Sequence, residues 1–486
     1  MSGDRLAMKN ATWLAAVALL AGCASTPPAS PERPTSGSTS TSGTSSTGPA
    51  FTRPSITLTP EPAAAPSASA AAKPAASAAP PTAAAPAATA APASAAAPAA
   101  AAPAAAPAAP AGPPPAMPFS KAVLAAANNL FGKADLGNAA TIRGNAVPYP
   151  LVIDPLVDGN SGYQSEATRA MERQIVELLK TGYPNFDVRP FTSSNLARGP
   201  LLFIGTFTAV DKDRKNVGEH DAYRICLALV DLRSGTILSK GLAFAEKDGV
   251  DIAPIAFYQE SPSWAPDPAI QGYVRTCQGT KAGDPINPVY WDRIVQAALI
   301  NDATIAYEER NYETSLDLFR AVARQPGGDQ LRVFNGIYLA ATKLGRKDEA
   351  AQAFARVVDF GLANNALGVM FTFRPSSTLF PPDPKVSGDY HMWIGQIAQR
   401  AAQRTACLEV AGHSSKTGPE PLNQRLSLMR AQYIKQRIDT AAPTLAKRTS
   451  ATGKGSSETK IGIGTDDVRD QLDRRVEFKV LDCPRT

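Results

Sequence analysis

The stretch that decides the fold of this chain occupies residues 411–478. It begins AGHSSKTGPEPLNQRLSLMRAQYIKQRI (411–438) and ends GTDDVRDQLDRRVEF (464–478). A Gly-His turn closes a predicted strand, a polar loop follows, and Asn423 opens a predicted amphipathic helix, for which asparagine is a suitable N-cap. Arg475 stands directly before the last predicted strand. The order strand, loop, helix, strand predicts a small α/β unit at this end of the chain.

Three motifs in this stretch resemble the peptidoglycan-binding OmpA-like domain family, over residues 366–486. The family signature reads GHTD-x-x-G, then N-x-x-L-S-x-x-R-A, then N/D-R-R-V. The three motifs stand here in that order, the second and third in full and the first as GHSS-x-x-G, with serines at its third and fourth positions. The resemblance implies an α/β sandwich that binds the diaminopimelate-type stem peptide of peptidoglycan. It also implies the site residues, which are Ser415, Asn423, Arg430 and Arg475.

The chain departs from the family at one position that matters for binding. In the family an aspartate receives the ligand ammonium and an arginine, here Arg430, holds the ligand carboxylate through its planar fork. Ser415 stands at the aspartate position. A hydroxyl still accepts a hydrogen bond, but the charge-assisted part, about 1–3 kcal/mol, is lost. Whether Ser415 suffices, or Asp466 or Asp467 compensates, stays open, and His413 is interpreted as holding the turn.

The start of the chain reads as a lipoprotein signal peptide over residues 1–22. A positive segment precedes the apolar run 13–20, which is too short to span a bilayer. Leu-Ala-Gly-Cys then resembles a lipobox, so Cys23 is the expected site of acylation, including palmitate. An ordinary secretory signal with an incidental cysteine is the alternative. By resemblance to such lipoproteins, Ala24 directs the protein to the outer membrane, facing the periplasm.

Residues 23–118 are expected to form a disordered tether. The segment holds 22 of the 43 prolines of the chain, mixed with alanine, serine and threonine. Proline removes backbone donors and disfavours helix in the residue before it, so an Ala/Pro-rich segment of this kind builds no core. Fully extended, it would reach roughly 300 Å.

Residues 119–283 predict an α/β domain. A helix begins near Ser165, and Ala167, Met171, Ile175 and Leu178 form one buried stripe. The expected strands are 149–156, 201–210, 223–231 and 236–245, the last two joined by a Ser-Gly hairpin turn. The phrases VIDPLVDGNSGYQSEATRAME, LLFIGTFTAVD and YRICLALVDLRSGTILSKG resemble the LpoB- and CsgG-like domain of envelope lipoproteins. An unrelated α/β domain with the same order of strands and helices is the alternative.

Residues 284–365 predict a helical module. The pattern Tyr312-x-x-Ser-x-x-x-Phe319 returns as Lys347-x-x-Ala-x-x-x-Phe354. This repetition resembles tetratricopeptide repeats, whose paired helices form a groove for peptides. A helical spacer packed on the flanking domains is the other interpretation, because a free solenoid needs about three repeats.

Four cysteines remain after Cys23, and an even number in an exported chain suggests disulfides. The simplest pairing is Cys226 with Cys277 and Cys407 with Cys483, with four free thiols as the alternative. Neither the cysteines nor the three histidines form a metal-binding or catalytic motif. No metal, no cofactor and no enzymatic activity are therefore expected.

The net charge of +6 is modest and its cations are spread out, which excludes an obvious nucleic-acid interface. Together these features predict a multidomain α/β and α+β lipoprotein of the outer membrane. It would bind peptidoglycan non-covalently and recruit or position a periplasmic protein partner. One alternative is a regulator that activates a penicillin-binding protein through the central domain. Another is an accessory subunit of a secretion or flagellar assembly in the envelope.

Overall fold

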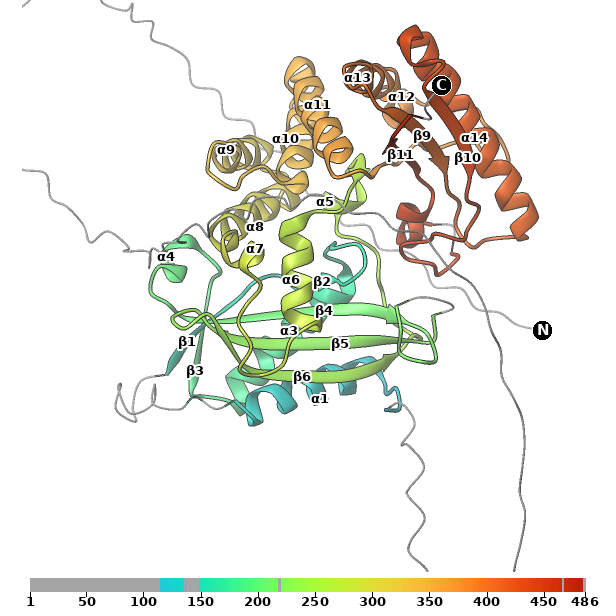
Figure 1. Ribbon diagram of the computed structural model, residues 1–486. Coiled ribbons are helices and arrows are strands. Elements are labelled where there is room, and N and C mark those ends of the chain that lie inside the picture. Colours follow the sequence, from blue (N-terminus) through green and yellow to red (C-terminus); the bar gives the residue numbers. More distant parts are fainter. Residues whose placement is uncertain (1–113, 135, 137–147, 217–219, 466, 484–486) are drawn as a thin grey trace, which may run out of the picture. The chain divides into compact units, whose positions relative to one another are not determined.

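The computed structural model describes residues 114–134, 136, 148–216, 220–465 and 467–483. This part of the chain is a mixed α/β structure with two sheets, in the orders β3-β1-β4-β5-β6, with β2 beside β4, and β10-β9-β11-β8-β7 (Figure 1). The expected signal peptide, Cys23 and most of the expected tether lie outside the described residues. Of the helices that are described, none has the length and apolar character to cross a membrane.

The first sheet combines parallel and antiparallel pairing. β1 is parallel to β3 and β4, whereas β4, β5 and β6 are antiparallel neighbours. Gly235 at φ 70° makes the tight turn between β5 and β6. The strands are β1 (Tyr149–Ile153), β2 (Val157–Asp158), β3 (Phe186–Arg189), β4 (Leu201–Val210), β5 (Ala222–Asp231) and β6 (Thr236–Glu246).

Both faces of this sheet are covered by helices. α1 (Phe119–Gly132) and α3 (Glu166–Gly182) enclose one apolar layer, and α6 (Pro268–Gln278) lies on the opposite face (Figure 1). Ser165 and Thr168 form a reciprocal capping box that starts α3. The buried stripe of α3 ends at Leu179 rather than at the expected Leu178, because Leu179 follows Ile175 by four residues. The short α4 (Ser193–Leu196) follows β3.

The described part of the chain includes residues on the N-terminal side of the boundary expected at residue 118. Met117 forms a parallel bridge with Ala245 of β6. Its N–H donates to Phe244 at 3.0 Å, and its carbonyl accepts from Glu246 at 2.9 Å. The last residues of the expected tether therefore belong to the edge of the first sheet.

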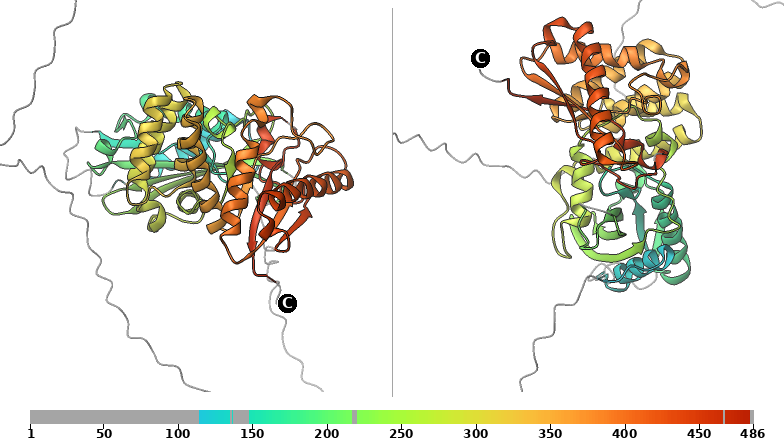
Figure 2. Two further views of the ribbon diagram at one scale, coloured as in Figure 1. Left: turned by 90° about the horizontal axis from the view of Figure 1, so that it is seen from above. Right: turned by 90° about the vertical axis from the view of Figure 1, so that its right-hand side faces the viewer.

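Residues 288–363 form helices that pack in sequence order, coloured yellow to orange in Figure 2. Phe319 and Phe354, the matching aromatic residues of the repeated pattern, are both fully buried. Asn335 exchanges two 3.0 Å hydrogen bonds with Ser263. The module thus packs on this chain's own flanking segment, which favours the spacer interpretation over a free peptide groove. The helices of the module are α7 (Pro288–Trp291), α8 (Ile294–Glu308), α9 (Tyr312–Ala323), α10 (Leu331–Lys343) and α11 (Lys347–Ala363). The short α5 (Ala256–Gln259) comes before α6.

The second sheet is built mostly from the C-terminal part of the chain. β9 is parallel to β10 and antiparallel to β11, and β8 pairs with both β11 and β7. The strands are β7 (Ser263–Trp264), β8 (Leu367–Val369), β9 (Cys407–Gly412), β10 (Thr449–Gly453) and β11 (Val476–Leu481). The helices are α12 (Pro384–Ser387), α13 (Tyr390–Ala402), α14 (Glu420–Ala441) and the 3-10 turns η1 (Pro443–Leu445) and η2 (Val468–Asp473). One apolar cluster runs from Ile255 to Phe478, so the core crosses the boundary expected at residue 365.

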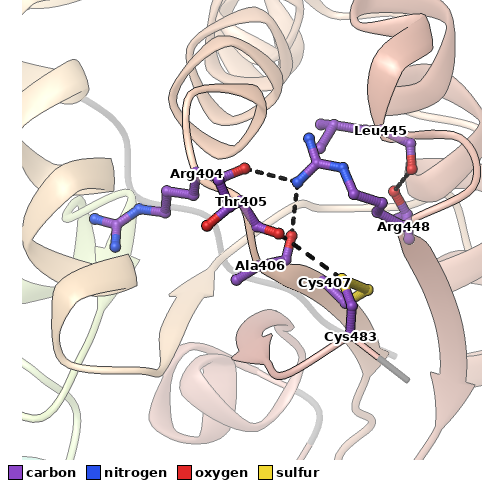
Figure 3. The surroundings of a disulfide bond; sticks show 8 residues. Arg404, Thr405, Ala406, Cys407, Leu445, Arg448 and Cys483 are labelled. Atoms are coloured by element: carbon purple, nitrogen blue, oxygen red, sulfur yellow. Dashed lines mark hydrogen bonds between the residues drawn. A yellow bond between two sulfur atoms is a disulfide. The ribbon is translucent and has the colours of Figure 1, made fainter. Parts of the chain in front are cut away.

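The cysteines divide into two pairs. A disulfide joins Cys407, at the start of β9, to Cys483, which follows β11 (Figure 3). Beside it, the Arg448 guanidinium donates to the carbonyls of Arg404 at 2.6 Å and Ala406 at 2.8 Å (Figure 3). The other expected bridge is not formed in this structure, where Cys226 and Cys277 are buried free thiols.

Candidate functional site

A polar pocket of about 780 Å³ opens in the C-terminal α/β unit. Four segments line it: residues 370–376 after β8, the loop 414–419 after β9, the first three turns of α14, and the end of η2. Three of the four expected site residues line this pocket, namely Ser415, Asn423 and Arg430. The motif spacing seen in the sequence therefore corresponds to one place in the fold.

Two glycines shape the loop between β9 and α14. A Cβ added to Gly412 would lie 2.0 Å from the Ser427 carbonyl, so glycine lets the end of β9 approach the helix closely. Gly418 has φ +84°, a left-handed conformation that glycine adopts without strain. Pro419 then precedes Glu420, where α14 begins.

Asn423 does not cap α14, contrary to expectation. The helix begins three residues earlier, and Asn423 lies in its first turn with only 8% of its surface exposed. Its side-chain Nδ2 donates to the carbonyls of Ser415 at 3.3 Å and Gly418 at 3.5 Å. Asn423 thus fixes the binding loop against the helix, which makes it a positioning residue.

Arg430 joins α14 to the segment after β8. Its Nε donates to the Ser377 carbonyl at 3.2 Å, and its guanidinium lies 4.8 Å above the ring of Phe373. Stacking on an aromatic face holds the guanidinium plane in one orientation. This segment of residues 370–377 was not foreseen from the sequence, because its contact with α14 is non-local.

The described lining residues of the pocket carry positive charge. Among the lining residues that the structure describes, the charged side chains are those of Arg425, Arg430 and Arg474. The Ser415 hydroxyl lies 3.4 Å from that of Thr417, and Ser415 is only 4% exposed. Guanidinium groups bind carboxylates with paired, charge-assisted hydrogen bonds. The described lining therefore favours a ligand that carries carboxylates.

Arg474, and not the expected Arg475, lines the pocket. Arg475 is 1% exposed, forms a 2.6 Å ion pair with Glu477 and does not line the pocket. Arg474, the residue before it, lines the pocket and pairs with Asp470 at 2.6 Å. The reason is geometric, since consecutive side chains at the entry to β11 point to opposite sides. The sequence motif R-R-V shows both arginines but not which of them faces the ligand.

A closed charge network is centred on Glu477 and also contains His413, Arg475, Lys479 and Glu458. His413 Nε2 is 3.6 Å from Glu477 Oε2, and His413 Nδ1 is 4.0 Å from Glu458 Oε2. Burial lowers the pKa of His413. Burial opposes ionisation of Glu477, yet neighbouring His413 and Arg475 hold the pKa of Glu477 below its usual range.

The side chains of His413, Glu458 and Glu477 bring possible ligand atoms within 4.8 Å of one another, a spacing at which they could hold a metal ion. Lys479 Nζ, however, lies 3.5 Å from both Glu458 Oε2 and Glu477 Oε2 and so already supplies a cation there. The arrangement is therefore an internal ion-pair network beside the Gly-His turn.

No protein-family model matches the chain, and no curated protein matches it. Solved structures match about a quarter of it. The periplasmic domain of Helicobacter pylori MotB is 15% identical, covers 24% of this chain and 76% of its own, and has a TM-score of 0.21. The cell wall anchor of the T6SS from Pseudomonas aeruginosa is 19% identical, covering 24% and 81%, with a TM-score of 0.20. The peptidoglycan-associated lipoprotein from Burkholderia pseudomallei is 16% identical, covering 24% and 91%, with a TM-score of 0.20. At these values the function has to be judged on the geometry of the pocket itself.

Proposed function

We propose that this protein binds peptidoglycan non-covalently through the C-terminal pocket and acts as a non-catalytic wall anchor. One observation carries the proposal. Ser415, Asn423 and Arg430, which the sequence places at the spacing of the OmpA-like signature, line a single pocket of about 780 Å³. Pockets of roughly 300–1,000 Å³ suit ligands of small-molecule size, such as a short stem peptide.

The chemistry of the pocket suits a diaminopimelate-type stem peptide. Such a peptide carries carboxylates along its length and an ammonium beside a carboxylate at one side-chain end. Arg430, oriented by Phe373 and Ser377, would hold a carboxylate bidentately. Ser415 would accept one hydrogen bond from the ammonium, without the charge that the family aspartate supplies.

The remaining parts would place this pocket at the cell wall. Acylated Cys23 would anchor the protein in the outer membrane, on the periplasmic side, and the Ala/Pro-rich segment would span the distance to the wall. The Cys407–Cys483 disulfide is typical of an oxidising compartment such as the periplasm. The α/β part around the first sheet would recruit or position an envelope protein partner.

Co-sedimentation with isolated peptidoglycan sacculi tests the proposal. The protein should be used with its full globular part, because β8 of the C-terminal unit pairs with β7 and the core continues to Ile255. We expect the protein to sediment with sacculi and Arg430→Ala to stay in solution. Arg437→Ala is the matched control, since Arg437 is exposed on the same helix and does not line the pocket. Equal sedimentation of all three proteins, or of none, would contradict the proposal.

A further inference from the structure

The two free thiols of the first α/β unit lie in direct contact. Cys226 on β5 and Cys277 on α6 are 5% and 0% exposed, and their Sγ atoms are 2.8 Å apart. Each thiol also reaches the other residue's backbone carbonyl, at 2.6 Å from Cys226 and 2.9 Å from Cys277. The sulfur atoms of a disulfide are about 2.05 Å apart, so the two Sγ atoms need to move only slightly closer together to form the bond.

We propose that Cys226 and Cys277 are a redox pair that closes to a disulfide in an oxidising compartment and ties strand β5 to helix α6. The backbone already holds the two side chains toward each other, because β5 is a central strand and α6 covers its face. The inference rests on the proposed periplasmic location for its oxidant, but its test does not depend on wall binding, since neither residue lines the C-terminal pocket.

The two thiols differ in acidity, which decides which of them attacks first. The hydrogen bond from Cys277 lowers the pKa of Cys226 against the effect of burial, and the charges of Lys240 and Arg224 act in the same direction. Burial raises the pKa of Cys277. Cys226 is therefore the thiolate that attacks, and Cys277 keeps its proton until the second step.

The reaction uses the disulfide of an exported thiol oxidase or of oxidised glutathione as the oxidant. The Cys226 thiolate attacks that disulfide and forms a mixed disulfide, and one oxidant sulfur leaves as a thiolate. Cys277 then loses its proton, attacks the Cys226 sulfur and releases the second oxidant sulfur. Two electrons pass to the oxidant, and its two thiolates take up two protons.

Peptide mapping of the full chain tests the inference directly. The protein is equilibrated with oxidised glutathione, its free thiols are alkylated, and it is digested with trypsin without reduction. We expect the peptides 225–233 and 276–281 to be linked, in the manner of peptides 405–416 and 480–485, which carry Cys407 and Cys483 and serve as the internal control. Recovery of 225–233 and 276–281 as separate alkylated peptides, beside the linked control, would overturn the proposal.

Thermal unfolding gives a second, independent readout. A bridge across 51 positions constrains the unfolded chain, so reductant should lower the Tm of the oxidised protein by about 5–10 °C more than it lowers the Tm of the C226S/C277S variant. The variant keeps the Cys407–Cys483 bridge and thus reports the effect of that bridge alone. Equal shifts in the two proteins would contradict the proposal, and the peptide map remains decisive should the variant fail to fold.

Discussion

The open pocket and the closed charge network of the C-terminal unit are made from residues that are neighbours in sequence. Ser415 and Arg474 face the pocket, whereas His413 and Arg475 belong to the network. Residues one or two positions apart thus contribute either to ligand binding or to stability. The difference shows that a charged residue in a binding motif has to be assigned by the face it occupies, not by its presence in the motif.

The largest expected effect concerns the closed network. Arg475→Ala removes one partner of a buried ion pair with Glu477 and should lower the free energy of unfolding by about 3–5 kcal/mol. Chemical denaturation followed by circular dichroism measures this loss. Arg437→Ala, which removes an exposed guanidinium, should change the same free energy little. Similar losses in both variants would mean that the buried ion pair of Arg475 does not stabilise the fold.

The next effect concerns the pocket. Ser415→Asp should tighten binding of a stem peptide with a free ammonium about tenfold, because a carboxylate adds a charge-assisted hydrogen bond. Calorimetric titration measures the change, with an N-acetylated peptide as the control ligand. The gain should disappear for that ligand, since acetylation removes the positive charge. An equal gain for both peptides would show that residue 415 does not contact the ammonium.

Part of this comparison could be predicted from the sequence. The resemblance to the OmpA-like signature implied Ser415, Asn423 and Arg430, and all three line one pocket because the loop and the start of the helix keep them close together. The role of Asn423 was wrong because Pro419 starts α14 earlier, at Glu420. The roles of Arg474 and Arg475 depend on where β11 begins, which short-range patterns do not fix. Phe373 and Ser377 reach Arg430 through tertiary packing, which the sequence pattern does not show.

The charge network also predicts a pH effect on stability. Because burial lowers the pKa of His413 in the folded protein, the unfolded chain takes up a proton first as the pH falls below about 6.5. Stability from this group is therefore complete above that pH and is lost toward the lower folded pKa, by at most about 1.4 kcal/mol per pH unit. The charged groups near the imidazole include Glu458, Glu477 and Arg475, with Lys479 and Lys460 on the far side of the carboxylates.

Unfolding free energies of the unaltered protein and of His413→Gln, measured between about pH 5 and pH 7, check this effect. The difference between the two proteins should become smaller as the pH falls, because the variant has no imidazole to protonate. His220, whose pKa burial also lowers, is present in both proteins and cancels in the comparison. A difference that stays constant with pH would refute the assignment to His413.

The smallest expected effect concerns the rim of the pocket. Arg425 lines the pocket but is exposed, so water and salt screen its charge. Arg425→Ala should weaken binding of a stem peptide only about two- to fivefold, and less at high salt. Titrations at two ionic strengths measure this. A loss as large as that of Arg430→Ala would mean that the ligand carboxylate is held at the rim.

The most direct test of the central claim is a calorimetric titration of a soluble diaminopimelate stem peptide into the unaltered protein, Arg430→Ala and Arg437→Ala. The proposed pocket predicts saturable binding by the unaltered protein and by Arg437→Ala, with at least about tenfold weaker binding by Arg430→Ala. Unfolding curves of the same samples should show that Arg430→Ala remains folded. Undiminished binding by folded Arg430→Ala, or no binding by the unaltered protein, would contradict the claim that this pocket is the peptidoglycan site.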